Sequence, residues 1–182
     1  TAIESGDYHA ASVINDMPVA IKLSGDTEWV PQNYDKNVYG PVPMVRALAQ
    51  SLNLATVNLS QDVGLSKIAT KFKQLGLTEQ PQAVPAIALG AVTAPPLEVA
   101  QIYNSIANGG FRSPLRAVRA VMDSQGNTLK AFPIEVTQVA EPTAMYQLQR
   151  MMIEVMRHGT GASSRAQLGE LVVAGKSGTS SD

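Results

Sequence analysis

The chain has 182 residues, enough for one hydrophobic core, and its 14 Lys and Arg residues nearly balance its 15 Asp and Glu residues. A net charge of -1 without a basic stripe excludes a protein that binds a nucleic-acid backbone electrostatically. The 45% of hydrophobic residues and 16% of charged residues, below the usual fraction of about 25%, indicate a globular chain whose neutral stretches face a core or a groove.

The first part of the chain predicts a helix end, a strand and a second helix. Residues 1–4 are typical of a helix C-terminus, because Gly6 suits the left-handed conformation that commonly closes a helix. Residues 19–23 are a strand candidate. Pro43 suits a first helical turn, and apolar residues at spacings of three and four after it predict a helix that ends near residues 51–53.

Two further helices are expected in the middle of the chain. Residues 66–75 have an apolar face and end at Gly76, and we expect the three lysines on the other side to face solvent. Pro95 and Pro96 suit the start of the next helix. Its apolar residues predict a broad buried stripe made of Leu97, Val99, Ala100, Ile102, Tyr103 and Ile106.

The last third combines strands with one long helix. Residues 116–122 and 128–132 predict a β-hairpin, because the connection between them is short and contains Gly. A helical pattern follows residues 141–143 up to His158, and its Met stripe indicates core packing. The apolar run at residues 171–175 predicts a strand that leads into Lys176. Together these elements predict an α+β organisation in one domain.

Several site classes find no support in the sequence. The chain has no Cys, which excludes disulfides and thiolate metal sites. His9 and His158 lack the partners of a Ser-His-Asp site and form no His-Glu-x-x-His pattern, so we expect no metal and no cofactor. The longest apolar tract, residues 84–94, is shorter than the roughly 20 residues of a membrane helix, so a membrane anchor is expected outside this chain.

Two polar triplets point to acyl-transfer chemistry. Ser51-Leu52-Asn53 follows a predicted helix end, and Lys176-Ser177-Gly178 follows the apolar run. Such triplets are two of the three found in penicillin-binding proteins and serine β-lactamases. The third, Ser-x-x-Lys, does not occur in residues 1–182.

A phosphate-binding loop is the main alternative for the second triplet. Gly175-Lys176-Ser177 matches the end of the Gly-x-x-x-x-Gly-Lys-Ser pattern. That pattern needs Gly at the position of Glu170, however, and Gly169 is one residue too early. Because the preceding run also predicts a strand rather than a flexible cradle, we favour acyl transfer.

With these triplets in view, nearly the whole chain resembles the transpeptidase domain of class A penicillin-binding proteins, most closely the 1b type. The resemblance is carried by residues 29–33, 47–59, 89–100, 106–110 and 158–161. It implies an α+β fold similar to that of serine β-lactamases, with a helical cluster packed on an antiparallel sheet. It also implies a D,D-transpeptidase that cross-links peptidoglycan stem peptides through a serine ester and is acylated by β-lactams.

The resemblance also implies where the chain lies in its domain. The nucleophile and general base of the family are the Ser and Lys of Ser-x-x-Lys, which are then expected before Thr1. Residues 1–182 are accordingly expected to form part of one transpeptidase domain, truncated at both ends and inactive by itself.

By the same resemblance, three residues are expected to be catalytic. Ser51 would relay a proton between the reacting amine and its neighbours. Asn53 would orient the amide of the donor peptide and the upstream lysine. Lys176 would supply the positive potential that favours the substrate carboxylate.

Three further residues are expected to bind substrate. Ser177 and Thr179 would donate hydroxyl hydrogen bonds to the substrate carboxylate. Gly178 would let the substrate backbone approach without a side-chain clash. The backbone N–H of Thr179 would form half of an oxyanion hole.

The cellular setting implied by the resemblance is the periplasmic face of the bacterial inner membrane. A glycosyltransferase domain and a membrane anchor would precede this domain, making the protein bifunctional. Expected partners are stem peptides on lipid II-derived glycan strands, β-lactam antibiotics and cell-wall regulatory proteins. Two alternatives stay open, namely a β-lactamase-like serine acylase and a catalytically inactive module that binds peptidoglycan or β-lactams.

Overall fold

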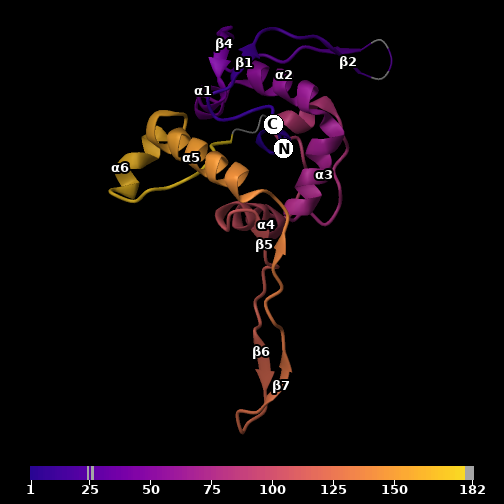
Figure 1. The fold of residues 1–182 in the computed structure, drawn as a ribbon, viewed down its shortest axis with the longest axis vertical. Helices are drawn as coiled ribbons and strands as arrows, with labels where there is room; N and C mark the ends of the chain where they lie inside the picture. The colour runs from indigo at the N-terminus through magenta and orange to yellow at the C-terminus, as the bar shows by residue number, and fades with distance from the viewer. Residues whose placement is uncertain (24, 26, 179–182) are drawn as a thin grey trace.

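The computed structural model describes residues 1–23, 25 and 27–178 (Figure 1). Runs of short strands are followed by runs of helices along the described chain, as expected for an α+β protein. The elements are η1 (Ile3–Ser5), β1 (Val13–Asp16), β2 (Ile21–Lys22), β3 (Glu28–Trp29), β4 (Gly40–Pro43), α1 (Met44–Ala49), α2 (Asn53–Val63), α3 (Leu65–Leu75), η2 (Pro85–Leu89), α4 (Pro96–Ala107), β5 (Phe111–Arg112), β6 (Ala120–Met122), β7 (Thr128–Ala131), β8 (Thr137–Gln138), α5 (Pro142–His158), η3 (Ala162–Ser164) and α6 (Arg165–Leu168).

The described strands form four antiparallel pairs, β1 with β4, β2 with β3, β5 with β8, and β6 with β7. In the first pair Val13 lies opposite Pro43 and Asp16 lies opposite Gly40. Alternate β1 residues, Ile14 and Asp16, point inward beneath α2. The expectation of helices packed on antiparallel strands is therefore confirmed.

The core lies between α1, α2, α5 and the β1–β4 pair. One buried cluster consists of Ile14, Val42, Met44, Ala47, Leu52, Ala55 and Met151. A second cluster joins the end of α3 to the start of α5 and consists of Leu75, Ala140, Ala144 and Met145. The predicted Met stripe of α5 is confirmed as core packing, because Met145, Met151 and Met152 are only 4–6% exposed.

Most helix ends lie where the sequence places them. Gly6 closes the short helix η1 with a φ of +83°, and α3 ends at Gly76. The proline pair begins α4. Strand β2 is shorter than predicted, and β1 and β4 were not predicted at all, because an isolated run such as Gly40–Pro43 carries no alternating pattern.

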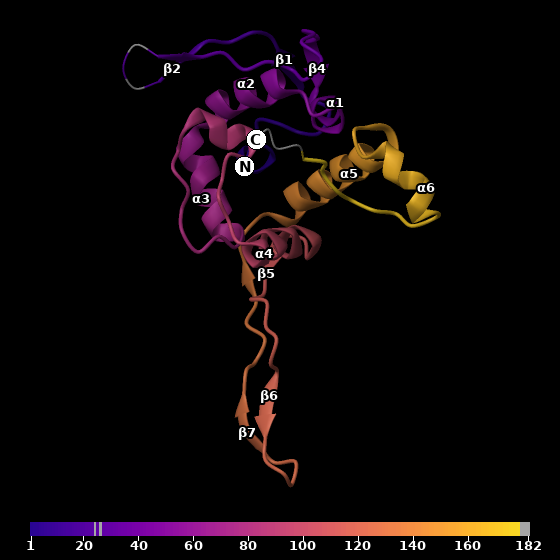
Figure 2. The ribbon, with the colours of Figure 1, turned by 180° about the vertical axis from the view of Figure 1, so that it is seen from behind.

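The predicted hairpin is confirmed and forms a projecting arm below α4 and β5 (Figure 1). Strands β6 and β7 pair Val121 with Lys130 across the arm. Every residue of β7 is exposed, and the view from behind shows the arm standing clear of the helices (Figure 2). A two-stranded ribbon of this kind gains little from core burial.

The predicted buried stripe of α4 is wrong for four of its six residues, and only Ile102 and Ile106 pack, partly buried, against the second core cluster. Leu97 is 65% exposed, and Val99 and Tyr103 are each 41% exposed. The buried residues of this helix are instead Gln101 and Ser105. The reason is that α4 packs on the end of α3 partly through polar contacts that a hydrophobic pattern cannot reveal, since the Ser105 hydroxyl donates to the Leu75 carbonyl at 2.8 Å.

One lysine of α3 also differs from the prediction of a solvated face. Lys71 lies 2.9 Å from Glu4 Oε1 and donates to the Val139 carbonyl at 3.0 Å. Burial opposes ionisation of Glu4, but the hydrogen bond from Lys71 and the surrounding positive charge outweigh it and lower the pKa of Glu4. Lys71 therefore ties η1 to α3 and to the segment that enters α5.

The predicted strand before Lys176 is also wrong for the described residues. Residues 171–178 form no strand, and Leu171 and Val172 are 73% and 65% exposed. A strand needs a neighbouring strand to accept its backbone hydrogen bonds, and within the described ranges this segment has none. Its backbone is held by α5 instead, because Gly175 N–H donates to the Met152 carbonyl at 3.3 Å. Among the described helices, none is long and apolar enough to cross a bilayer.

Candidate active site

The two triplets of the sequence meet in space. Lys176 Nζ donates a hydrogen bond to Ser51 Oγ at 2.8 Å, although 125 positions separate the residues in the chain. The same ammonium group donates to the Ser177 carbonyl at 3.0 Å. A cation and a hydroxyl are thus held together at the corner between α1 and α2.

Ser51 occupies an unusual backbone position in this corner. Its φ is +56°, in the left-handed region that favours Gly. The Ser51 N–H donates to Leu48 O at 3.2 Å, and the Leu52 N–H donates to Ala47 O at 2.9 Å. These two bonds form a Schellman motif in which Ser stands at the position usually taken by Gly. A serine at a strained position directs attention to its hydroxyl.

A turn after α5 connects the two halves of the site. The Thr160 N–H donates to the Ala49 carbonyl at 3.0 Å, two residues before Ser51. Gly159 allows this approach, because a Cβ at that position would lie 2.1 Å from the Ala49 oxygen. The Thr160 hydroxyl lies 2.5 Å from the Ser177 hydroxyl. One turn therefore contacts both the end of α1 and the residue after Lys176.

The other predicted substrate-binding residues lie at the end of the described chain. Ser177 and Gly178 are exposed. No described atom beyond the neighbours of Gly178 in the chain lies within 4 Å of a Cβ added there, so packing in the described part of the chain does not require this glycine. Thr179 lies outside the described residues.

Asn53 begins α2 directly after the corner. Its Nδ2 donates to the carbonyl of Gln32 at 2.8 Å, in the loop that follows β3. The acceptor is a carbonyl, so the amide nitrogen is the atom that faces Gln32. The structure thus places Asn53 between the corner and this loop.

A buried polar pair beneath Asn53 was not found from the sequence. Asp16 is fully buried and Asn33 is 4% exposed. Asn33 Nδ2 donates to Asp16 Oδ2 at 2.7 Å. A usable signal was present, because Leu52 at the N-cap of α2 cannot cap the helix and the N–H groups of its first turn need acceptors from elsewhere.

The electrostatics of the corner depend on Lys176. Burial lowers the pKa of Lys176, because desolvation penalises the ammonium form. Among the described residues, no carboxylate forms an ion pair with Lys176. Within the described residues, the hydrogen-bond partners of its ammonium group are two dipoles, the Ser51 hydroxyl and the Ser177 carbonyl.

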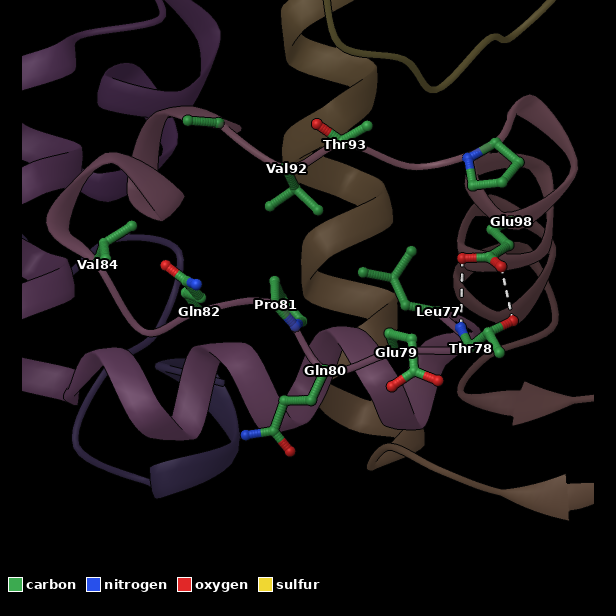
Figure 3. A pocket seen from close by; sticks show the side chains of 12 residues that line it. Leu77, Thr78, Glu79, Gln80, Pro81, Gln82, Val84, Val92, Thr93 and Glu98 are labelled. Carbon is green, nitrogen blue, oxygen red and sulfur yellow. Dashed lines mark hydrogen bonds between the residues drawn. The ribbon is translucent and has the colours of Figure 1, made fainter.

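A well-defined hollow lies elsewhere in the molecule. It has a volume of about 380 Å³ and lies between residues 77–84 and 91–95 (Figure 3). Both carboxylate oxygens of Glu98 accept hydrogen bonds from Thr78, one from its backbone N–H and one from its hydroxyl. None of the predicted site residues lines this hollow, so we place the candidate site at the α1–α2 corner.

Comparisons with known proteins show the family of the chain. Residues 1–181 match the family model described as the penicillin-binding protein transpeptidase domain. Penicillin-binding protein 1B of Vibrio cholerae is 35% identical over 184 residues, which cover 100% of this chain and 24% of that protein. The chain thus spans about a quarter of the length of this curated relative.

Two solved structures share the fold. Penicillin-binding protein 1A from Haemophilus influenzae superposes with a TM-score of 0.85 at 21% identity, covering 98% of this chain and 32% of that chain. Penicillin-binding protein A from M. tuberculosis, solved as an imipenem acyl-enzyme complex, gives a TM-score of 0.71 at 19% identity over 86% of this chain and 41% of that chain. At these identities the similarity concerns the fold alone.

Proposed function

This chain belongs to the penicillin-binding protein transpeptidase family, and we propose that it forms part of a D,D-transpeptidase domain in a longer protein. The resemblance to the 1b type is confirmed by the relative from Vibrio cholerae. The proposed reaction cross-links peptidoglycan stem peptides through a serine ester. The serine nucleophile and its lysine base would belong to a Ser-x-x-Lys sequence that precedes Thr1 in that protein.

The hydrogen bond between Lys176 and Ser51 is the observation that carries this proposal. A phosphate loop would direct its lysine toward an anion cradled by backbone N–H groups. Here the Lys176 ammonium donates to a side-chain hydroxyl on another element, 2.8 Å away. A hydroxyl held by a cation is suited to pass a proton, since general acid–base transfer requires contacts of about 2.6–3.2 Å.

Ser51 would act as the proton relay of the reaction. When the peptide bond of the donor breaks, its amine leaving group must gain a proton, and Ser51 can deliver one and regain one from a neighbouring group. When the acceptor amine then attacks the serine ester, the same hydroxyl can carry a proton in the reverse direction. Ser51 Oγ already accepts a hydrogen bond from Lys176, so its own proton is free to be directed toward the reacting groups.

Lys176 and Ser177 would bind the carboxylate of the substrate or of a β-lactam. An ammonium group without a carboxylate partner in the described part of the chain attracts an anion, and the exposed Ser177 hydroxyl can donate to it. Gly178 leaves room beside this position, and Thr179 would contribute a second hydroxyl and an oxyanion-hole N–H. Asn53 would orient the amide of the donor peptide.

The setting proposed for the whole protein follows its relatives. We place it at the periplasmic face of the bacterial inner membrane, where stem peptides and β-lactams are its ligands. A glycosyltransferase domain, a membrane anchor and cell-wall regulatory partners belong to the same proposal.

Mass spectrometry of the full-length protein tests this function. After incubation with benzylpenicillin, we expect the intact mass to increase by one penicillin per protein and the adduct to persist. An adduct that hydrolyses within seconds would favour a β-lactamase-like acylase. The absence of any adduct would favour a catalytically inactive binding module and overturn the proposal.

A further inference from the structure

We propose that Asp16 and Asn33 are positioning residues that set the orientation of the Asn53 carboxamide, an inference that rests on the transpeptidase function proposed above. Asp16 lies at the end of β1 and Asn33 lies in the loop after β3. Neither residue is assigned a role by the two polar triplets. Both are buried directly beneath the start of α2, where Asn53 is the first residue.

The two side chains cap α2 from outside the helix. Asp16 Oδ1 accepts a hydrogen bond from the Ala55 N–H at 3.0 Å, and Asn33 Oδ1 accepts one from the Leu54 N–H at 3.2 Å. These are the N–H groups that a Ser, Thr, Asp or Asn at the N-cap would normally satisfy. Because Leu52 takes the N-cap position without a side-chain hydrogen bond, the position of the first turn depends on β1 and on the loop.

The carboxylate of Asp16 is held by N–H donors and the helix dipole. Asp16 Oδ2 accepts from Asn33 Nδ2 at 2.7 Å and from the Tyr39 N–H at 2.9 Å. No ammonium or guanidinium group within the described ranges forms an ion pair with Asp16. The positive end of the 11-residue helix α2 supplies favourable potential instead. A buried carboxylate with fixed donors on both oxygens is a rigid reference point.

Asn33 passes this rigidity to Asn53 through the loop backbone. Asn33 Nδ2 also donates to the Asn37 carbonyl at 2.9 Å, which closes the loop around the side chain. The neighbouring residue, Gln32, then offers its carbonyl to Asn53 Nδ2 at 2.8 Å. Asn33 thus fixes both ends of this contact, the first turn of α2 that carries Asn53 and the Gln32 carbonyl that accepts its hydrogen bond.

The orientation of the carboxamide has a chemical consequence. With Nδ2 held by the Gln32 carbonyl, Asn53 Oδ1 points away from that carbonyl and can accept a hydrogen bond from the amide N–H of the donor peptide. Without the Gln32 contact, the carboxamide can rotate and present an N–H where an acceptor is needed. A misplacement of about 1 Å in such a site lowers the rate by up to about a hundredfold.

Acylation kinetics of the full-length protein with a fluorescent penicillin test this role. The variants are Asn33→Ala, Asn53→Ala and the double variant. Asn37→Ala is a matched control, because the Asn37 side chain donates to Asp35 in the same loop, whereas its backbone carbonyl remains available to Asn33. The labelled fraction at saturation measures folded protein, so each rate is expressed per folded molecule. Asn33→Ser, whose hydroxyl can still accept from Leu54, serves if the alanine variant does not fold.

We expect Asn33→Ala to lower the limiting acylation rate by about 10- to 100-fold and Asn37→Ala to leave it unchanged. The half-saturating penicillin concentration should change by less than about twofold, because the carboxylate contacts of Lys176 and Ser177 remain. The double variant should acylate as slowly as Asn53→Ala alone, since Asn33 acts through Asn53.

Two outcomes overturn the inference. One is an Asn33 variant that acylates like the Asn37 control. The other is a double variant whose rate loss equals the product of the single losses, because Asn33 then acts independently of Asn53. A wild-type protein that forms no adduct contradicts the proposed transpeptidase function instead, so the two failures are distinguishable.

Discussion

At position 51, at the α1–α2 corner, the backbone conformation favours Gly, whereas the proposed chemistry needs the hydroxyl of Ser. At a φ of +56°, Gly is the residue that backbone energetics favour at position 51. Ser51→Gly and Ser51→Ala both remove the hydroxyl that accepts from Lys176. They differ only in the Cβ, so comparing the two isolates the backbone strain from the loss of the hydroxyl.

The magnitude follows from the conformation of Ser51. An L-residue in the left-handed region costs about 1–2 kcal/mol, and the added freedom of Gly in the unfolded chain offsets about 0.5–1 kcal/mol of that. We therefore expect Ser51→Gly to be more stable than Ser51→Ala by about 0.5–1 kcal/mol, or about 1–4 °C in Tm. Both variants should acylate at least about a hundredfold more slowly than wild type, because the relay is lost.

Differential scanning calorimetry and penicillin labelling of the same preparations check both parts. Equal Tm values for the Gly and Ala variants would refute the strain argument. Labelling of either variant at the wild-type rate would refute the role of the hydroxyl. A stable but slow Ser51→Gly variant is the result that the structure predicts.

Three further predictions follow from the site and its supports. The acylation rate should fall as pH rises and Lys176 loses its proton, and because burial lowers the pKa of Lys176, this fall should occur at a lower pH than for an ordinary lysine. In a pH–rate profile of Lys176→Arg, the same fall should occur at a higher pH, because arginine keeps its charge. Gly159→Ala should lower Tm by forcing a backbone shift, at a cost of about 1–3 kcal/mol, whereas Gly178→Ala should leave Tm unchanged and slow acylation; equal Tm losses would contradict this. Lys71→Met should lower Tm near neutral pH but much less in acid, because the lowered pKa of Glu4 gives stability that is present above its unfolded pKa and lost as pH falls through the folded pKa; a pH-independent loss would argue against the ion pair.

Local patterns were sufficient for most of the helices. The apolar spacing after Pro43, Gly76 as a stop signal and the proline pair before α4 all depend on neighbours in sequence, and the structure agrees with each. The Met stripe of α5 was predictable for the same reason. The spacing of apolar residues and the Pro and Gly signals at helix ends therefore identify helices well, even where they do not predict what a helix face contacts.

The errors arise where a partner distant in sequence decides the outcome. Tyr103 is exposed because α4 turns its polar side, including Ser105, toward the end of α3. The apolar run before Lys176 forms no strand because no described neighbour pairs with it. Lys71 is tied to Glu4, which lies 67 positions earlier in the chain. The secondary-structure propensities of the residues do not predict any of these contacts.

The meeting of two residues of the candidate site was predictable from the sequence, but the residues that support them were not. The residue types of the two triplets suggested Ser51 and Lys176, and family resemblance supplied their roles. The buried pair of Asp16 and Asn33 could not be found from any motif, because it acts through hydrogen bonds to backbone N–H groups of another element. Only the missing cap at Leu52 hinted that such acceptors must exist.

A crystal structure of the full-length protein acylated by benzylpenicillin tests the central claim most directly. We expect the carboxylate of the adduct within hydrogen-bond distance of Ser177, with Lys176 Nζ and Ser51 Oγ still within about 3 Å of each other beside the acyl group. An adduct bound elsewhere on the molecule, or one that leaves Lys176 and Ser51 far apart, would contradict the account.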